Sequence, residues 1–342
     1  MDAFTTSLAR SPELFPQAWD PIADIVRLIR LRETDYRSAS FLDDRILNPQ
    51  TAGRTVAWHQ LQAAVAEAGL KENCSFIFHT GHVGSTLLSR LLGGHPQVFA
   101  LREPAILRAL AQDQIKSGNE PVPDERLGTF LKLWSRTFRA EQRVCVKATS
   151  FASEIAGSIL ARPSVPRALF MFVPAETYLA TILGAEHSPQ EARSLAENRL
   201  KRLHRRIGAE RWTLSSLSEG EMIAMSWASE MSALAAAAEP SGDRVLWLNF
   251  EDFLTEPAIS LAAAFCHLGI RAVPQDVAAI LAGPYMRRYS KAPEYAYDAQ
   301  LRREVLDRAR RGHRVEISRG LAWLENASNE LPMLKHAGST VR

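Results

Sequence analysis

The chain has 342 residues, 46% of them apolar and 23% charged, and its 41 lysines and arginines against 38 acids leave a formal net charge of +3. This composition excludes a mostly disordered chain and a collagen-like or low-complexity polymer. Because the basic excess is small, we expect no nucleic-acid partner.

The sequence carries no signal for secretion, membrane insertion or metal binding. Its three cysteines, Cys74, Cys145 and Cys266, are isolated and form no CxxC pair, so we expect neither a disulfide framework nor a metal site. The first fifteen residues lack a basic stretch followed by an apolar one, and no run of 18 apolar residues occurs. We therefore expect a cytoplasmic protein with no membrane partner.

Residues 1–70 are predicted to form a helical N-terminal addition. Pro21–Glu33 has apolar residues at helical spacing after a proline, which favours a helix start. Thr55–Gly69 is a second predicted helix, which ends on its glycine.

Beyond residue 74 the pattern changes to short apolar runs separated by helix-like segments. Runs of this kind are typical of buried parallel strands whose crossover helices cover both faces of the sheet. Five such runs occur, at residues 75–79, 98–102, 143–148, 168–173 and 244–250. We predict an α/β fold in which a roughly five-stranded parallel sheet lies between two layers of helices.

Two helical segments have a distinctive composition. Ser188–Trp212 carries basic residues opposite its leucines, and this face is either solvated or a positive wall beside an anionic ligand. Its basic residues are Arg199, Lys201, Arg202, His204, Arg205 and Arg206. The next long helix holds Met222, Met225, Trp227 and Met231, which we expect in the core. Residues 271–342 are predicted to be helical apart from a loop at 283–298, and we expect one domain, 1–342, with its core in residues 74–270.

The most informative segment follows the first apolar run. A strand ending at His79 precedes Thr80, Gly81, His82, Val83, Gly84, Ser85 and Thr86, and leucines at helical spacing come next. Glycines let backbone N–H groups converge on an anion, hydroxyls add donors, and a helix N-terminus adds a favourable dipole. The segment is a candidate phosphate-binding loop, although a tight strand-to-helix turn also fits. It is not a Walker A loop, because no lysine precedes Ser85.

The stretch 82–86 resembles the phosphosulfate-binding loop of the sulfotransferase family, in which [KR]-S-G-[ST]-[ST] lies between a strand and a helix. His95–Pro104 is similar to family members in which His-Pro leads to a glutamate, and Arg244–Pro257, with Trp227 upstream, is similar to the family's late strand. The resemblance covers roughly residues 74–270 and implies a P-loop three-layer sandwich. It also implies 3′-phosphoadenosine 5′-phosphosulfate (PAPS) as donor, 3′,5′-adenosine bisphosphate (PAP) as product, no metal, and a small-molecule or peptide acceptor with a hydroxyl or amine.

Three residues are candidates for the chemistry. Glu103 follows the second strand at its carboxyl end and matches the glutamate that the resemblance implies as a base; it also fits a helix N-terminal glutamate before Pro104. Lys147 ends an apolar strand and is a candidate cation at the transferred group, unless its ammonium reaches solvent. His82 stands where the family has lysine or arginine, and its donor capacity depends on pH.

The resemblance further implies a 3′-phosphate site made by an arginine and a serine. Here Val173 stands at the arginine position and Thr181 at the serine position. We therefore expect the positive charge to come from Arg287, Arg288 or Lys291, or from the basic helix around Arg202.

Two other functions are open at this point. A non-catalytic nucleotide- or anion-binding protein on the same fold is favoured by the residues at positions 82 and 173. A divergent P-loop kinase would use Glu251 or Asp252 for magnesium, but the missing loop lysine disfavours it.

Overall fold

The computed structural model describes residues 2–118, 124–162, 164 and 167–331. Its centre is a five-stranded, all-parallel sheet with the strand order β5-β6-β4-β7-β8. The strands are β4 (Cys74–His79), β5 (Val98–Arg102), β6 (Arg143–Lys147), β7 (Ala168–Phe172) and β8 (Val245–Asn249). This sheet confirms the predicted α/β fold class, and each strand begins and ends within one residue of its predicted run.

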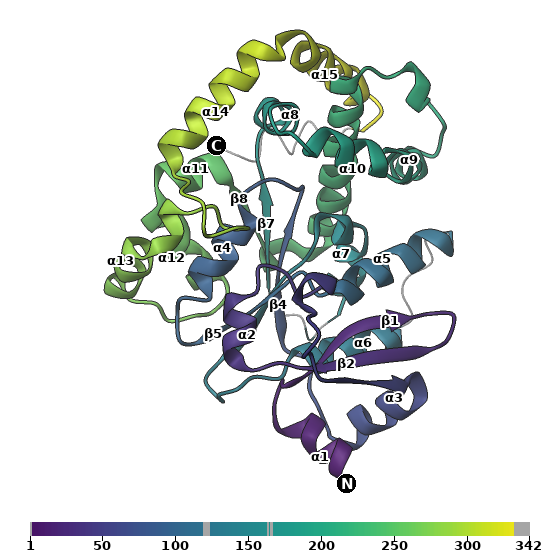
Figure 1. Ribbon diagram of the computed structural model, residues 1–342. Helices are drawn as coiled ribbons and strands as arrows, with labels where there is room; N and C mark the ends of the chain where they lie inside the picture. The colour runs from purple at the N-terminus through teal and green to yellow at the C-terminus, as the bar shows by residue number, and fades with distance from the viewer. Residues whose placement is uncertain (1, 119–123, 163, 165–166, 332–342) are drawn as a thin grey trace.

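Helices cover both faces of the sheet (Figure 1). Successive side chains of a strand point to opposite faces, so Phe76 and Phe78 belong to one buried cluster and Ile77 to the other. The helices between the strands are α4 (Ser85–Leu92), α5 (Ala105–Lys116), α6 (Asp124–Trp134), α7 (Ala156–Leu160), α8 (Ala175–Leu183), α9 (Ser188–Ile207) and α10 (Glu219–Ala238). None of the described helices is long and apolar enough to span a membrane.

Residues 2–70 contain a second, antiparallel sheet that the sequence analysis did not predict. It has the order β1-β2-β3 and is accompanied by three helices. Its elements are α1 (Ala3–Arg10), β1 (Leu14–Asp20), β2 (Ile25–Arg30), α2 (Glu33–Ser38), β3 (Gly53–Ala57) and α3 (Trp58–Glu67). The predicted helix over Pro21–Glu33 is wrong, because Ile25, Val26, Leu28 and Ile29 lie in β2, which pairs with β1 and β3 on its two sides. The predicted helix over Thr55–Gly69 exists but begins later, because residues 55–57 belong to β3.

The C-terminal part is helical up to Ala327, and residues 332–342 of the predicted helical part lie outside the described residues. Its helices are α11 (Phe250–Thr255), α12 (Pro257–His267), α13 (Pro274–Ala282), α14 (Ala299–Gly312) and α15 (Arg314–Ala327). The predicted loop at 283–298 contains a single 3-10 turn, Pro284–Arg287, and a bridge between Arg288 and Ala296. In Figure 1, α14 and α15 arch over α8, and both pack against it. The four predicted core residues of α10 are buried.

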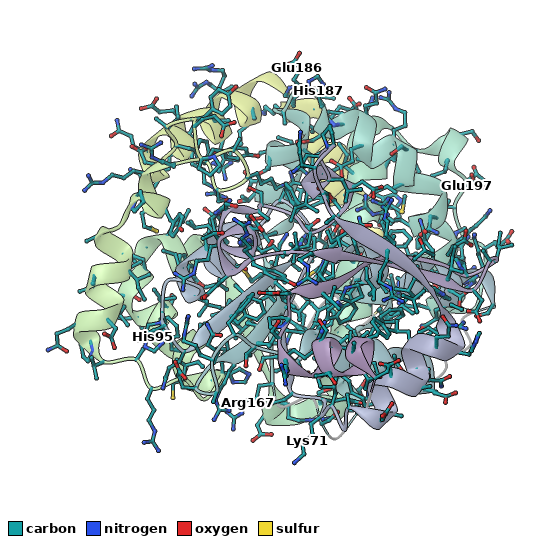
Figure 2. All side chains as sticks on the ribbon, turned by 60° about the horizontal axis from the view of Figure 1, so that its bottom comes forward. Lys71, His95, Arg167, Glu186, His187 and Glu197 are labelled. Carbon is teal, nitrogen blue, oxygen red and sulfur yellow. The ribbon has the colours of Figure 1, made fainter. Side chains whose placement is uncertain are left out.

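The carboxyl ends of the parallel strands share one edge of the sheet. Lys71 and Arg167 precede β4 and β7, and Figure 2 shows them on the opposite side of the molecule from Glu186 and His187, which follow α8. Strand β4 lies between β6 and β7, so the chain builds one half of the sheet first and the other half afterwards. Open α/β sheets bind ligands at the carboxyl edge beside such a reversal of strand order.

Candidate functional site

The loop between β4 and α4 turns through three left-handed residues. Gly81, His82 and Gly84 have φ angles of 95°, 54° and 71°. At Gly84, the residue that caps α4, a Cβ atom would lie 2.2 Å from ring atoms of Phe250, so only glycine fits there. The turn leaves the free backbone N–H groups of the first turn of α4 at the carboxyl end of β4, where they can donate to an anion.

The hydroxyl groups of this loop are buried. Ser85 and Thr86 open α4, and the Oγ1 atoms of Thr80 and Thr86 have no hydrogen-bond partner among the described residues. A buried hydroxyl without a partner costs about 1–3 kcal/mol. Thr86 lines the cavity described below, so an anion oxygen bound there would supply the missing partner.

His79, at the end of β4, fixes the loop to the neighbouring strand. Its Nε2 donates to the carbonyl oxygen of Ala148 at 2.9 Å, and its Nδ1 accepts from the backbone N–H of Gly81 at 3.0 Å. Burial, assisted by the positive charge of Lys147, holds the pKa of His79 well below its usual range, so the ring is neutral. His79 is therefore a packed, hydrogen-bonded histidine.

Glu103 and Lys147 form a buried ion pair at the ends of β5 and β6. The parallel register places the two strand ends side by side, and the N–H of Glu103 donates to the carbonyl of Lys147 at 2.7 Å. The Lys147 ammonium donates to Oε1 of Glu103. Lys147 is 1% exposed, so its ammonium does not reach solvent. Burial lowers the pKa of Lys147, and the carboxylate of Glu103 opposes that shift.

The free side of Glu103 faces the N-terminal part of the chain. Its Oε2 lies 4.0 Å from a guanidinium nitrogen of Arg45, and its side chain is 15% exposed. The Arg45 guanidinium stacks on the ring of Phe41 at 3.4 Å and is held by the carboxylate of Asp43. Glu103 also has a left-handed φ of 51° and lies two residues before α5, so it is not the N-terminal residue of that helix.

These groups line one cavity of about 880 Å³. Ligand pockets of proteins are typically about 300–1,000 Å³. Two further segments form part of its walls: the N-terminal cavity segment, residues 38–46, and the C-terminal cavity segment, residues 284–297. They contribute Phe41, Asp43, Asp44 and Arg45, and Tyr285, Met286, Arg288, Tyr289, Ser290, Lys291 and Tyr297.

The cavity brings together most of the residues that the sequence analysis proposed for the site. They are Gly81, His82, Val83, Gly84, Ser85, Thr86, Glu103, Lys147, Thr181 and Lys291. Thr80 and Arg287 do not line it, whereas Arg288 does. The hydroxyl of Thr181 donates to the carbonyl of Thr177 at 2.7 Å. Val173 is fully buried and its carbonyl accepts from the indole of Trp227 at 3.1 Å.

Arg302 of α14 is a cavity residue that the sequence analysis missed. It forms a two-pronged ion pair with Glu251 and lies over the ring of Phe250, 5.2 Å from its centroid. Glu251 was a candidate magnesium ligand in the kinase interpretation, but its carboxylate is taken up by this arginine. The sequence around Arg302 contains no recognisable motif, so it does not predict that this residue lies in the cavity.

On the predicted basic face of α9, Arg199 and Arg202 are buried and Arg206 is partly buried, and all three form ion pairs away from the cavity. Lys201 and Arg205 are exposed, so the solvated interpretation holds for those two residues only. Arg199 donates to Glu230 at 3.0 Å, and Arg202 donates to Glu230 at 2.9 Å and to Glu154 at 2.6 Å. Arg206 also donates to Glu154. Burial raises the pKa of Glu230, but Arg202 and Arg199 outweigh it and hold that pKa at about 2. Arg202 does not line the cavity, so it cannot serve a 3′-phosphate there.

Within the described part of the chain, no group of three or more His, Cys, Asp or Glu side chains is arranged to hold a metal ion. Of the cavity cations, Arg45 and Arg302 have carboxylate partners. No ion pair of Lys291 or Arg288 is found among the described residues, and Arg288 donates only to the carbonyl of Pro293 at 3.0 Å.

No family model matches this sequence, and neither does any curated protein sequence. Sulfotransferases are among the solved structures that match. A sulfotransferase domain from the curacin biosynthetic pathway is 14% identical, with 75% of this chain and 98% of that chain covered and a TM-score of 0.40. A sulfotransferase from Alicyclobacillus acidocaldarius is 15% identical, covers 73% and 97%, and has a TM-score of 0.34. Mouse sulfotransferase SULT7A1, complexed with PAP, is 11% identical, covers 82% and 94%, and has a TM-score of 0.33. Identities of 11–15% and TM-scores of 0.33–0.40 do not place this chain in that family.

Proposed function

We propose that this chain is a sulfotransferase-like enzyme that binds PAPS and transfers its sulfuryl group to an acceptor hydroxyl or amine. One observation carries the proposal. The anion-binding N-terminus of α4 and the buried pair of Glu103 and Lys147 line the same cavity, at the carboxyl edge of the sheet. A cavity that offers anion donors on one wall and a carboxylate beside a cation on another suits transfer of a negatively charged group to a proton-bearing acceptor.

The loop and α4 hold the anionic end of the donor through backbone N–H groups and the hydroxyls of Ser85 and Thr86. Thr86 supports this role, because its buried Oγ1 has no other partner among the described residues. Lys291 and Arg288 supply positive charge to the rest of the nucleotide in place of the arginine that Val173 replaces.

Glu103 takes the proton of the acceptor on Oε2, since Oε1 is held by Lys147. The bond from the acceptor atom to sulfur forms while the bond from sulfur to the bridging oxygen breaks, and that electron pair stays on the 5′-phosphate of PAP. Lys147 fixes the carboxylate and adds positive charge next to the reacting group.

The experiment is a thermal-shift titration with PAP, followed by a transfer assay. We expect millimolar PAP to raise the melting temperature, because a ligand that binds only the folded state stabilises it. We expect labelled sulfate to move from PAPS to at least one compound in a panel of alcohols, phenols, amines and tyrosine peptides. No shift with PAP, in a sample that unfolds cooperatively, would contradict the proposal.

A second candidate is a non-catalytic protein that binds a nucleotide or another anion. The observation that favours it is the ion pair itself, because Glu103 is engaged by Lys147 rather than free. A PAP-induced shift without consumption of PAPS across the whole acceptor panel would support this candidate. A shift with ATP and magnesium alone would favour a kinase instead.

A further inference from the structure

Arg90 is a buried arginine whose guanidinium binds backbone and hydroxyl oxygens instead of a carboxylate. It lies in the last turns of α4 and is 5% exposed. Its Nε donates to the carbonyl of Ser290 at 2.8 Å, and its Nη2 donates to the hydroxyl of Ser40 at 2.7 Å and to the carbonyl of Ser38 at 3.4 Å. No ion pair of Arg90 is found among the described residues. Burying this charge without a carboxylate is costly, so the bonds it makes need an explanation.

The partners of Arg90 belong to both segments that close the cavity. Ser38 and Ser40 lie in the N-terminal cavity segment and Ser290 in the C-terminal one. The two segments are also joined directly, since the hydroxyl of Ser40 donates to the carbonyl of Lys291 at 3.0 Å. The guanidinium further lies 5.7 Å from the ring centroid of Tyr285 in the C-terminal cavity segment.

We propose that Arg90 is a positioning residue that holds both cavity segments in place relative to the phosphate-binding loop. The loop begins the same helix that carries Arg90, so one rigid element sets the position of the anion donors and of the two segments. Arg90 does not line the cavity; it acts through the two segments, which carry the cavity residues Lys291 and Arg45. The part of this inference that concerns the donor rests on the proposed function.

An arginine suits this position because its planar guanidinium donates several hydrogen bonds in fixed directions. A lysine offers one small ammonium, which cannot span the Ser290 carbonyl and the Ser40 hydroxyl with the same geometry. The conservative substitution Arg90→Lys therefore keeps the charge and removes the bridge.

The test compares hydrogen exchange and PAP affinity in the unmodified protein, Arg90→Lys and Ser40→Ala. We expect Arg90→Lys to speed amide exchange about tenfold in residues 38–46 and 284–297 of the ligand-free protein, and to weaken PAP binding about tenfold. Ser40→Ala keeps Arg90 and its bond to Ser290 but removes the hydroxyl that accepts from Arg90 and donates to Lys291. We therefore expect faster exchange in residues 38–46 and 284–297, by less than in Arg90→Lys.

Arg136→Lys is the matched control. Arg136 is equally buried and also binds backbone carbonyls, those of Leu8, Ser11, Leu14 and Leu133 at 2.6–3.0 Å, but it does not line or border the cavity. We expect it to lower the melting temperature without changing PAP affinity or exchange in the two cavity segments.

Exchange in both segments that stays at the rate of the unmodified protein in Arg90→Lys and in Ser40→Ala would overturn the proposal. So would an increase spread evenly over the whole chain, as a merely structural arginine would give. Failure of the unmodified protein to bind PAP would contradict the proposed function, and the exchange rates of the ligand-free variants would then still decide the positioning role.

Discussion

Glu103→Gln separates the two roles of the Glu103 carboxylate, as the base for the acceptor and as the partner of Lys147. The substitution keeps the shape of the side chain and removes its charge. If Glu103 is the base, turnover falls about 10²–10⁴-fold, the range that general base catalysis contributes. PAP affinity stays within about threefold, because the loop and α4, which we propose as the nucleotide site, are untouched.

The same substitution leaves Lys147 buried without its partner, so it also lowers the stability of the fold. Removing one member of a buried ion pair costs about 3–5 kcal/mol. This figure is an upper limit here, because the lysine can lose its proton. Burial already lowers the pKa of Lys147, Glu103 raises it in opposition, and the substitution removes that opposing effect.

The sign of the pH dependence follows from this shift. Where the folded-state pKa of Lys147 lies below its unfolded value, the unfolded chain binds more protons between the two values, so stability rises with pH in that window. In Glu103→Gln the window is wider. We expect the difference in unfolding free energy from the unmodified protein to be largest near neutral pH and to shrink as pH approaches about 10.4, the ordinary pKa of lysine.

The assay is urea unfolding at several pH values, together with sulfuryl transfer and PAP binding. Glu103→Gln/Lys147→Met should be more stable than Glu103→Gln at neutral pH, because no unpaired ammonium is left. Glu197→Gln is the control: Glu197 pairs with Lys201 on the surface of α9, where both side chains are exposed and Figure 2 shows Glu197 at the edge of the molecule. It should change stability by less than about 0.5 kcal/mol. Unchanged stability of Glu103→Gln at pH 7 would refute the account of the ion pair, and unchanged turnover would remove Glu103 as the base.

Three further outcomes test other parts of the structure. Thr86→Val should leave the unfolding free energy unchanged or raise it by about 1 kcal/mol, because the hydroxyl has no partner among the described residues, while PAP affinity falls about tenfold; equal affinity would exclude this hydroxyl from anion binding. Gly84→Ala should cost about 1–2 kcal/mol for its left-handed φ and about 1–3 kcal/mol for its clash with Phe250, whereas Gly208→Ala, with a φ of 70° and no atom within 4 Å, should cost only the first amount in the same urea assay. Burial raises the pKa values of Cys74 and Cys145 to about 12 each, so a thiol reagent at pH 8 should label only the exposed Cys266 in the folded chain; a second fast-reacting thiol would contradict the buried positions.

The central sheet could be predicted from the sequence because its strands are buried on both faces. Such strands are nearly continuous apolar runs, and the runs at 98–102 and 168–173 end where the strands end or one residue beyond. The N-terminal sheet could not be predicted in the same way. Ile25, Val26, Leu28 and Ile29 fit the spacing of a helix and that of a strand, and only the pairing with β1 and β3 decides between them.

Some residues of the candidate site could be predicted from the sequence and others could not. The loop, Glu103 and Lys147 could be found because each lies at the end of a recognisable strand, and the ends of parallel strands meet at one edge. Phe41 and Arg45 come from the N-terminal cavity segment, whose approach to β5 depends on backbone contacts such as the N–H of Leu42 to the carbonyl of Arg102 at 2.7 Å. The ion pairs of the α9 arginines were missed because their partners, Glu230 and Glu154, are far from them in the sequence, 28–31 residues away for Glu230 and 48–52 for Glu154.

The charge balance of the chain says little about the charge in the cavity. Arg45 and Arg302 are offset by Asp43 and Glu251, and Lys147 is offset by Glu103. Nevertheless the pKa of His82 is lowered, by burial first and then by the positive charges of Lys291, Arg199 and Lys147.

A neutral His82 donates only one hydrogen bond and carries no charge. It therefore cannot replace the charge of the lysine or arginine at this position in the sulfotransferase loop that residues 82–86 resemble. If a polyanionic donor binds here, that charge has to come from groups without a carboxylate partner. Among the described cavity residues these include Lys291 and Arg288, and both lie on the segment that is hydrogen-bonded to Arg90 of α4. Because His82 is neutral, the positive charge for such a donor depends on where the C-terminal cavity segment holds Lys291 and Arg288.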